Sequence, residues 1–195
     1  KRVGVDETSS RRGQRYVTLF HDADEGRLLF ATLGRNAATF KAFAADLKAH
    51  GGDAEAITDV SMDMSQAFQA GAAKHCPNAR PTFDPFHVVA LASRALDEVR
   101  RAEVKLEPDL KGSRWALLKD ARRWSHPQIC TMHWLQRSGL KTARAWRLKE
   151  ALRSLYAAPR THEGAGYELD RWISWARRSR LPAFKRLGAT VHEHR

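Results

Sequence analysis

The sequence predicts an α/β protein in which a mixed β-sheet is followed by a long helical region. In the first part of the chain, short runs of β-branched and aromatic residues such as residues 16–20 alternate with turn-forming residues, which is typical of strands. After His87, apolar residues recur every three or four positions, which is typical of helices. We therefore expect an α/β part over residues 1–105 and an all-helical part over residues 106–195.

The α/β part begins with three expected strands, over residues 1–8, 16–20 and 27–33, which polar turns join into antiparallel hairpins. The period then changes, and Asn36 is placed to cap a helix that the pair Gly51-Gly52 ends. These elements predict a meander of three strands followed by a helix.

A fourth strand is expected over residues 56–62, a second helix from Ser65 to near Pro77, and a short fifth strand over residues 80–83. The resulting order, β-β-β-α-β-α-β, is typical of an RNase H-like fold. Further on, helices are expected from residue 88 to near Glu107, and then around three segments that contain Trp115, Leu148 and Trp172.

The chain is strongly basic, with 34 Lys and Arg against 22 Asp and Glu, a formal net charge of +12 and a pI near 10.3. This charge favours an anionic partner, with DNA or RNA ahead of an anionic membrane surface. The apolar runs are far too short to span a bilayer, so no membrane association is predicted. Cys76 and Cys130 match no metal-binding or disulfide pattern, which predicts two free thiols in a cytoplasmic protein.

Asp6 and Asp63 are the strongest candidate catalytic residues, because each is expected at the end of a strand and these strands are neighbours in an RNase H-like sheet. Two carboxylates that lie close together repel each other, and a divalent cation relieves the repulsion by binding both. Such a pair is suited to hold Mg²⁺ or Mn²⁺ for in-line attack by water or a 3′-hydroxyl on phosphorus. The alternative is that each Asp is a turn or cap residue.

Asp84 and His87 form a D-x-x-H pattern at the start of a predicted helix. Asp84 is placed to cap the helix, and His87 to orient a carboxylate, a water or a phosphate. The alternative for His87 is a half-buried side chain beside Phe86.

Basic residues become denser in the helical part, where six tryptophans are interleaved with them. Several of these arginines are expected to contact DNA phosphates, although a solvated helical face over an aromatic core would show the same pattern. The candidate DNA-binding residues are Arg100, Arg101, Arg122, Arg123, Arg144 and Arg147.

Five segments carry a resemblance to a known family: GVDE (4–7), RYVTL (15–19), SMDMS (61–65), FDPFHVV (83–89) and WRLKEALRSLY (146–156). In this order they resemble the transposases of the ISL-three group of bacterial insertion sequences. The resemblance implies a DDE recombinase with an RNase H-like core and a helical insertion. It maps the first catalytic acid onto Asp6 and the second onto Asp63, and the D-x-x-H pattern onto Asp84 and His87. Asp84 is the alternative second metal ligand, and the strand order favours Asp63.

The family's third acid is a Glu on a helix after the insertion, and no matching segment occurs before Arg195. Its N-terminal zinc-binding and helix-turn-helix regions have no match either, so we expect an internal fragment with an incomplete triad. The resemblance implies double-stranded DNA as partner, both transposon ends and target, together with homo-oligomerisation of the full-length protein and a location at the bacterial nucleoid. The alternatives are a non-catalytic DNA-binding remnant and another RNase H-like nuclease such as a resolvase.

Overall fold

The computed structural model describes residues 1–11, 15–157 and 162–194, and the chain forms two compact units. The first unit is Lys1–His87 and the second is Val88–Arg195. The division falls near the start of helix α3 (Pro85–Glu103), whereas the sequence placed the change of architecture near residue 105, just beyond the end of that helix. Within the described ranges, every helix is too short or too polar to cross a membrane.

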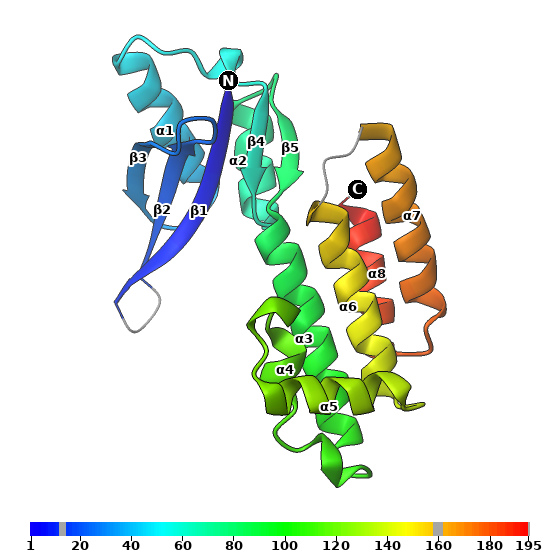
Figure 1. The fold of residues 1–195 in the computed structure, drawn as a ribbon. Helices are drawn as coiled ribbons and strands as arrows, with labels where there is room; N and C mark the ends of the chain where they lie inside the picture. The colour runs from blue at the N-terminus through cyan, green and yellow to red at the C-terminus, as the bar shows by residue number, and fades with distance from the viewer. Residues whose placement is uncertain (12–14, 158–161, 195) are drawn as a thin grey trace. The chain divides into compact units, whose positions relative to one another are not determined.

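The first unit contains an RNase H-like mixed sheet with strand order β3-β2-β1-β4-β5, as the sequence predicts. β1 pairs antiparallel with β2 and parallel with β4, so it lies in the middle of the sheet (Figure 1). β3 extends the antiparallel side and β5 extends the parallel side. The elements are β1 (Arg2–Arg11), β2 (Arg15–Asp22), β3 (Leu28–Leu33), α1 (Ala37–Ala49), β4 (Asp59–Met62), α2 (Gln66–His75) and β5 (Arg80–Phe83).

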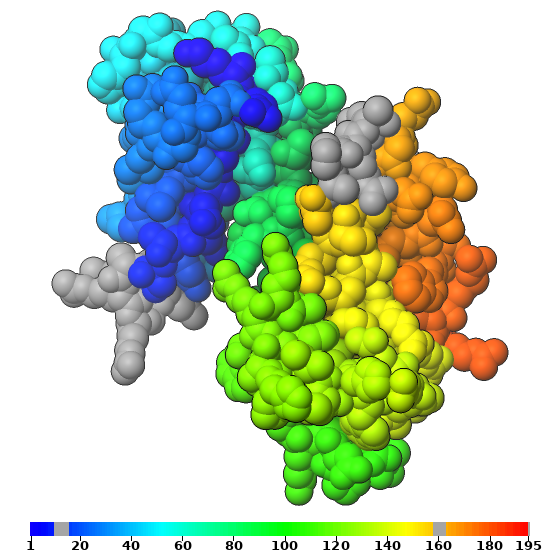
Figure 2. All heavy atoms as spheres, viewed as in Figure 1, coloured from blue at the N-terminus to red at the C-terminus, as the bar shows by residue number. Residues whose placement is uncertain are grey.

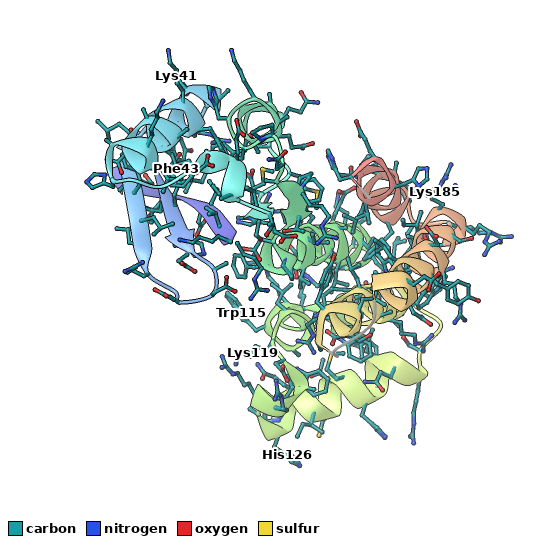
Figure 3. All side chains as sticks on the ribbon, turned by 90° about the horizontal axis from the view of Figure 1, so that it is seen from above. Lys41, Phe43, Trp115, Lys119, His126 and Lys185 are labelled. Atoms are coloured by element: carbon teal, nitrogen blue, oxygen red, sulfur yellow. The ribbon has the colours of Figure 1, made fainter. Side chains whose placement is uncertain are left out.

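A core rich in phenylalanine fixes helices α1 and α2 on one face of this sheet. Phe20 of β2 stacks on Phe43 of α1 with ring centroids 4.3 Å apart, and Phe40 meets Phe68 of α2 edge-on at 5.9 Å. All four rings are at most 1% exposed. Figure 3 shows Phe43 directed toward the sheet, whereas Lys41 of the same helix projects away from it. The opposite face of the sheet is left to the polar residues of β1 and β4.

The second unit is helical throughout the residues described. Its elements are the rest of α3, α4 (Arg114–Leu118), α5 (His126–Arg137), α6 (Lys141–Ala157), α7 (His162–Arg178) and α8 (Pro182–Glu193). Buried indoles join these helices through hydrogen bonds: Trp172 Nε1 donates to the carbonyl of Leu148 at 2.8 Å, which fastens α7 to α6. α7 and α8 pack on each other in the same unit.

Several predicted elements have different bounds in the structure. The strand expected over residues 1–8 continues to Arg11, so Asp6 lies within β1 and not at its end, because the hairpin with β2 is longer than predicted. The strand expected over residues 56–62 begins only at Asp59, because Ala54–Ala56 form a 3₁₀ turn that the Asp53 carboxylate caps through the Glu55 N–H. The helix that contains Trp115 ends at Leu118, because the backbone of Lys119 is extended.

Helix α5 was missed by the sequence analysis. Its N-terminus carries two recognisable signals, since Pro127 lies in the first turn and Gln128 Oε1 accepts a hydrogen bond from the Ser125 N–H at 3.1 Å. The apolar spacing in this helix is weak, with only Met132 and Leu135 buried, so periodicity alone does not reveal it.

Candidate active site

The strand pairing leads us to expect Asp6, Asp63 and Asp84 near one another. The ladder between β1 and the parallel strand β4 ends with Gly4 opposite Ser61, and its direction leads toward Asp6 and Asp63, two residues further along each chain. Met62 pairs with Phe83 of β5, and Asp63 and Asp84 are the residues that follow these two. The Asp84 N–H donates to the Met62 carbonyl at 2.9 Å, which continues the β4–β5 ladder to this point. Neighbouring strands lie about 4.8 Å apart, so carboxylates at such positions are expected within reach of one cation.

Side-chain alternation sends Asp6 to the face that α1 and α2 leave open. Val3 and Val5 are each 4% exposed and belong to the phenylalanine-rich core, so Gly4 and Asp6 lie on the other face. The Asp6 side chain is 58% exposed there. His21 lies over Gly4 so closely that a Cβ on Gly4 would be 2.1 Å from its Nε2. Glycine at position 4 therefore makes room for an imidazole beside the carboxylates.

Each of the three carboxylates accepts a local backbone hydrogen bond through Oδ1. Asp6 Oδ1 accepts from the N–H of Glu7, the next residue of β1, at 2.7 Å, and Asp63 Oδ1 accepts from the Ser65 N–H at 2.8 Å. Asp84 Oδ1 accepts from the Phe86 N–H at 2.7 Å, at the start of α3. The bonds of Asp63 and Asp84 are the turn and cap roles that the sequence offered as an alternative, whereas Asp6 lies within a strand. Within the described residues, none of these bonds uses Oδ2.

The three candidate carboxylates lack the ion pairs that some other acids of the first unit form. Arg80 pairs with Asp59 at 2.9 Å, and Arg2 pairs with Asp24. In the ranges that the structure describes, no Lys or Arg lies within ion-pair distance of Asp6, Asp63 or Asp84. The nearest basic group is His87 Nε2, at 3.8 Å from Asp6 Oδ1. Their negative charge thus remains available to an external cation.

His87 and Glu7 complete the surroundings of this edge. His87 lies in the first turn of α3, where its N–H donates to the Asp84 carbonyl at 3.1 Å, and its ring reaches toward Asp6. Burial raises the pKa of Glu7, Arg35 opposes that shift, and the charges of Asp63 and Asp6 add to it. Glu7 therefore lies in the field of both candidate metal ligands.

The donor set suits a hard cation such as Mg²⁺, which takes oxygen ligands and often binds through one or two protein carboxylates together with water and substrate phosphates. Across residues 1–11, 15–157 and 162–194, no three His, Cys, Asp or Glu side chains are grouped so that they could hold a metal ion by themselves. A cation held by these carboxylates would therefore need water or phosphate oxygens at its other positions.

Charge is divided unequally between the two units. Residues 1–87 contain 11 Lys and Arg and 11 Asp and Glu, whereas residues 88–195 contain 23 and 11. The whole net charge of +12 therefore belongs to the second unit.

The six candidate DNA-binding arginines occupy three different surroundings in that unit. Arg100 is 13% exposed and bonded to Asp97 at 2.8 Å, whereas Arg101 is 68% exposed. Arg122 is 89% exposed and bonded to Asp120, with Arg123 exposed next to it. The remaining two, Arg144 and Arg147, line a hollow along α6.

That hollow also contains residues that the sequence analysis did not select, namely Trp175, Arg178 and Arg180. The sequence contained a signal for Trp175 and Arg178. Together with Arg171 they are spaced i, i+4, i+7 and so share one face of a helix.

Comparison with known proteins identifies relatives along the whole chain. A family model for DDE transposases of the ISL3 type, described as "Transposase", matches residues 3–195. The transposase for insertion sequence element IS1557 of Mycobacterium tuberculosis (strain H37Rv) is 36% identical over 223 residues, covering 100% of this chain and 49% of the relative. The transposase for insertion sequence element IS1001 of Bordetella parapertussis is 29% identical over 162 residues, covering 79% of this chain and 39% of the relative. The chain spans about half the length of the IS1557 relatives.

Proposed function

Because the chain belongs to the ISL3 (ISL-three) transposase family, we propose that it supplies the catalytic carboxylates and a DNA-binding helical region of a DNA transposase. The reaction is metal-dependent cleavage and transfer of DNA strands at the ends of an insertion sequence. The observation that supports this proposal is the parallel pairing of β1 with β4, which ends at Gly4 and Ser61 and leads toward Asp6 and Asp63, both without a Lys or Arg partner in the described residues.

In this proposal Asp6 and Asp63 would hold Mg²⁺ or Mn²⁺ between them. The cation, when bound, supplies Lewis-acid stabilisation of charge on the phosphate oxygens. The chain's own part is to fix the ligands: the hydrogen bonds from Ser65 N–H and Glu7 N–H hold the two carboxylates in place. His87, 3.8 Å from Asp6, is positioned to orient Asp6 or a phosphate, and Asp84 is the alternative second ligand.

The partner in this proposal is double-stranded DNA, both transposon ends and target. The excess of 12 positive charges in residues 88–195 supports a phosphate-binding surface there, apart from the carboxylates. The full-length transposase is proposed to act as a homo-oligomer.

Metal binding is the direct test of the carboxylate pair. Titration of the chain with Mn²⁺, followed by electron paramagnetic resonance of the free ion, should show one weak site, with affinity lowered about tenfold or more by Asp6→Asn or Asp63→Asn because each removes a ligand charge. Asp46→Asn, which removes one carboxylate from α1, is the matched control and should bind Mn²⁺ as the parent does. Equal loss in all three variants would reject a specific site at these carboxylates.

DNA binding tests the helical region. The affinity of the chain for a duplex should fall steeply between about 50 and 200 mM salt, because several phosphate contacts release counterions. Duplexes of unrelated sequence should show similar affinities. An affinity that does not change with salt would show that the positive charge does not form a DNA surface.

A non-catalytic DNA-binding role is the second candidate function. It is favoured by the finding that, in the described parts of the chain, no group of three metal-ligating side chains exists. The two candidates differ in one outcome, which is whether Asp6 and Asp63 are needed for strand cleavage in a protein as long as the IS1557 relatives.

A further inference from the structure

Two adjoining hollows lie between helices α6 and α7 of the second unit. The first has a volume of about 510 Å³ and is lined by Arg171, Trp175 and Arg178 together with the side chains of α6. The second has a volume of about 370 Å³, shares Trp175 and Arg178, and adds Arg144 and Arg147. Because they share two residues they form one continuous depression, called here the α6–α7 groove. In Figure 2, α6 (yellow) and α7 (orange) come to the surface next to each other on the near face of this unit.

The groove has a rigid floor. Trp172 is 3% exposed, and its Nε1 donates to the Leu148 carbonyl at 2.8 Å, so α7 is held to α6 at the centre of the groove. Trp175 lies one turn further along α7 and is 43% exposed. One tryptophan therefore fixes the helices while the next presents its ring to solvent.

The groove is strongly positive. Glu168, which lines its first hollow, lies 3.5 Å from Arg171. Within the described ranges, no carboxylate lies within ion-pair distance of Arg144, Arg147 or Arg178. Nε of Arg144 is buried and has no hydrogen-bond partner among the residues described. Such guanidinium groups are suited to bind the oxygens of phosphates.

Arg180, at the end of the second hollow, has a backbone conformation that favours glycine. Its φ is +61°, and among the described residues it is the one non-glycine residue with positive φ. It follows α7 where a helix commonly ends with glycine in the left-handed conformation. A non-glycine residue at such a position costs stability, and its side chain is then a candidate for a function.

The exposed indole of Trp175 between arginines indicates what kind of polyanion the groove binds. In a duplex the faces of the bases are stacked on each other, so a protein ring cannot reach them. In a single strand the bases are free to stack on an aromatic side chain while arginines follow the phosphates. Trp175 flanked by Arg171 and Arg178 has this arrangement.

We propose that the α6–α7 groove binds single-stranded DNA, with a base stacked on Trp175 and phosphates held by Arg178, Arg144 and Arg180. The inference rests on the proposed function as a DNA transposase, which brings DNA to the chain, and it names an unpaired strand as the ligand of this surface. It does not depend on the carboxylates of the first unit.

Binding of a fluorescent thymidine 12-mer and of a mixed-sequence duplex, measured by anisotropy with the 195-residue chain, tests the proposal. Trp175→Ala should weaken binding of the single strand about tenfold, as loss of one stacked base predicts, and change duplex binding less than about twofold. Trp175→Phe should restore most of the loss. Arg178→Ala should weaken single-strand binding and reduce its salt dependence by about one phosphate contact. Arg177→Ala is the matched control, because Arg177 packs against Gly188 of α8, and it should behave as the parent does.

Arg180→Gly separates a binding role from a structural one. It should raise the melting temperature, because glycine adopts positive φ without strain, and should weaken single-strand binding. Unchanged single-strand binding in Trp175→Ala, or equal losses in Trp175→Ala and Arg177→Ala, would overturn the inference while leaving the proposed transposase function in place. Loss of duplex and single-strand binding to the same extent in Trp175→Ala would also overturn it. If the parent chain binds neither the single strand nor the duplex, both this inference and the DNA-binding part of the proposed function are rejected.

Discussion

The two units of this chain differ in their charge. The α/β unit is electrically neutral overall, and Asp6, Asp63 and Asp84 have no Lys or Arg partner in the described residues, although some other acids of that unit, such as Asp24 and Asp59, are paired. The helical unit holds the whole excess of positive charge. Arginines placed directly beside Asp6 and Asp63 would compete with a divalent cation for them. In the proposed function, this separation would let one unit attract DNA phosphates while the other keeps its carboxylates for metal.

The units also differ in how their interiors are built. The α/β unit has a dry core of stacked and edge-on phenylalanines. The helical unit buries a charged group, since Lys149 is 1% exposed, donates to the Leu117 carbonyl at 2.7 Å and lies 2.5 Å from Glu150. Truncation of an apolar side chain should therefore leave a cavity in the α/β unit, whereas truncation of Lys149 should leave buried polar groups without a partner in the helical unit.

The largest effect is expected at the carboxylates. In a protein as long as the IS1557 relatives, Asp6→Asn or Asp63→Asn should lower the rate of strand cleavage by about a thousandfold or more, because the amide keeps the shape but not the charge that a cation needs. Cleavage of a labelled transposon end in Mg²⁺ measures this, with Asp46→Asn as control. If activity survives Asp63→Asn and is lost in Asp84→Asn, the second ligand is Asp84.

The next largest effect is expected in the phenylalanine core. Phe43→Ala should destabilise the α/β unit by about 3–5 kcal/mol, because it leaves a cavity beside Phe20 and Phe40. Phe86→Ala, at a side chain that is 74% exposed, is the control and should cost less than about 1 kcal/mol.

All six tryptophans lie after residue 87, so their fluorescence reports on the helical unit alone. In Phe43→Ala, faster hydrogen exchange of the strand amides in urea should reveal the lower stability of the α/β unit. The urea midpoint of tryptophan fluorescence, which reports on the helical unit, should move much less. Equal shifts in both signals would show that the units unfold together and would remove the contrast between them.

The sequence predicted the α/β unit better than the helical one, for a physical reason. Strand signals there are strong: residues 16–20 are β-branched and aromatic, and the observed β2 contains them. Asn36 was expected to cap α1, and its side chain does accept from the Ala38 N–H at 3.0 Å. The expected end of the first strand was wrong, since β1 continues past Asp6 to Arg11, because the pattern does not show how far a hairpin extends.

Helix packing could not be predicted in the same way. The α6–α7 groove depends on how Arg144 and Arg178, 34 positions apart in the sequence, are brought together, and no local pattern encodes this. Arg100 and Arg101 have the same charge and adjacent positions, and both contact Asp97, yet only the fold shows that Arg100 is largely buried and Arg101 is exposed.

A smaller effect is expected at Lys149. Lys149→Ala should destabilise the helical unit by about 1–3 kcal/mol, because the Leu117 carbonyl and Glu150 lose their buried partner. The double variant Lys149→Met, Glu150→Gln fills the space without a buried charge and should recover much of the loss. Urea unfolding followed by tryptophan fluorescence measures both. A double variant less stable than Lys149→Ala would contradict this account.

The pH dependence of stability gives an independent test of the same lysine. Burial lowers the pKa of Lys149, so between its folded pKa and its ordinary value near 10.5 the unfolded state binds more protons. Stability should therefore rise with pH in that alkaline window. As the pH is raised toward 10.5, the parent should gain stability relative to Lys149→Met. Below the folded pKa of Lys149, the difference between their unfolding free energies should be constant. Other titrating groups, such as Tyr156, cancel in this difference. A difference that does not change with pH would show that folding does not lower the pKa of Lys149.

The smallest effect is expected at the neighbouring arginines of α3. Arg101→Ala should weaken duplex binding about two- to threefold at low salt and reduce the salt slope by about 0.9, as loss of one phosphate contact predicts. Arg100→Ala removes the same charge, but Arg100 is 13% exposed and bonded to Asp97, so it should alter duplex binding less and lower the melting temperature more. Anisotropy titrations at three salt concentrations, with melting curves on the same samples, separate the two. Equal weakening by both substitutions would mean that the net charge of the helical unit, and not the exposure of particular arginines, determines how it binds DNA.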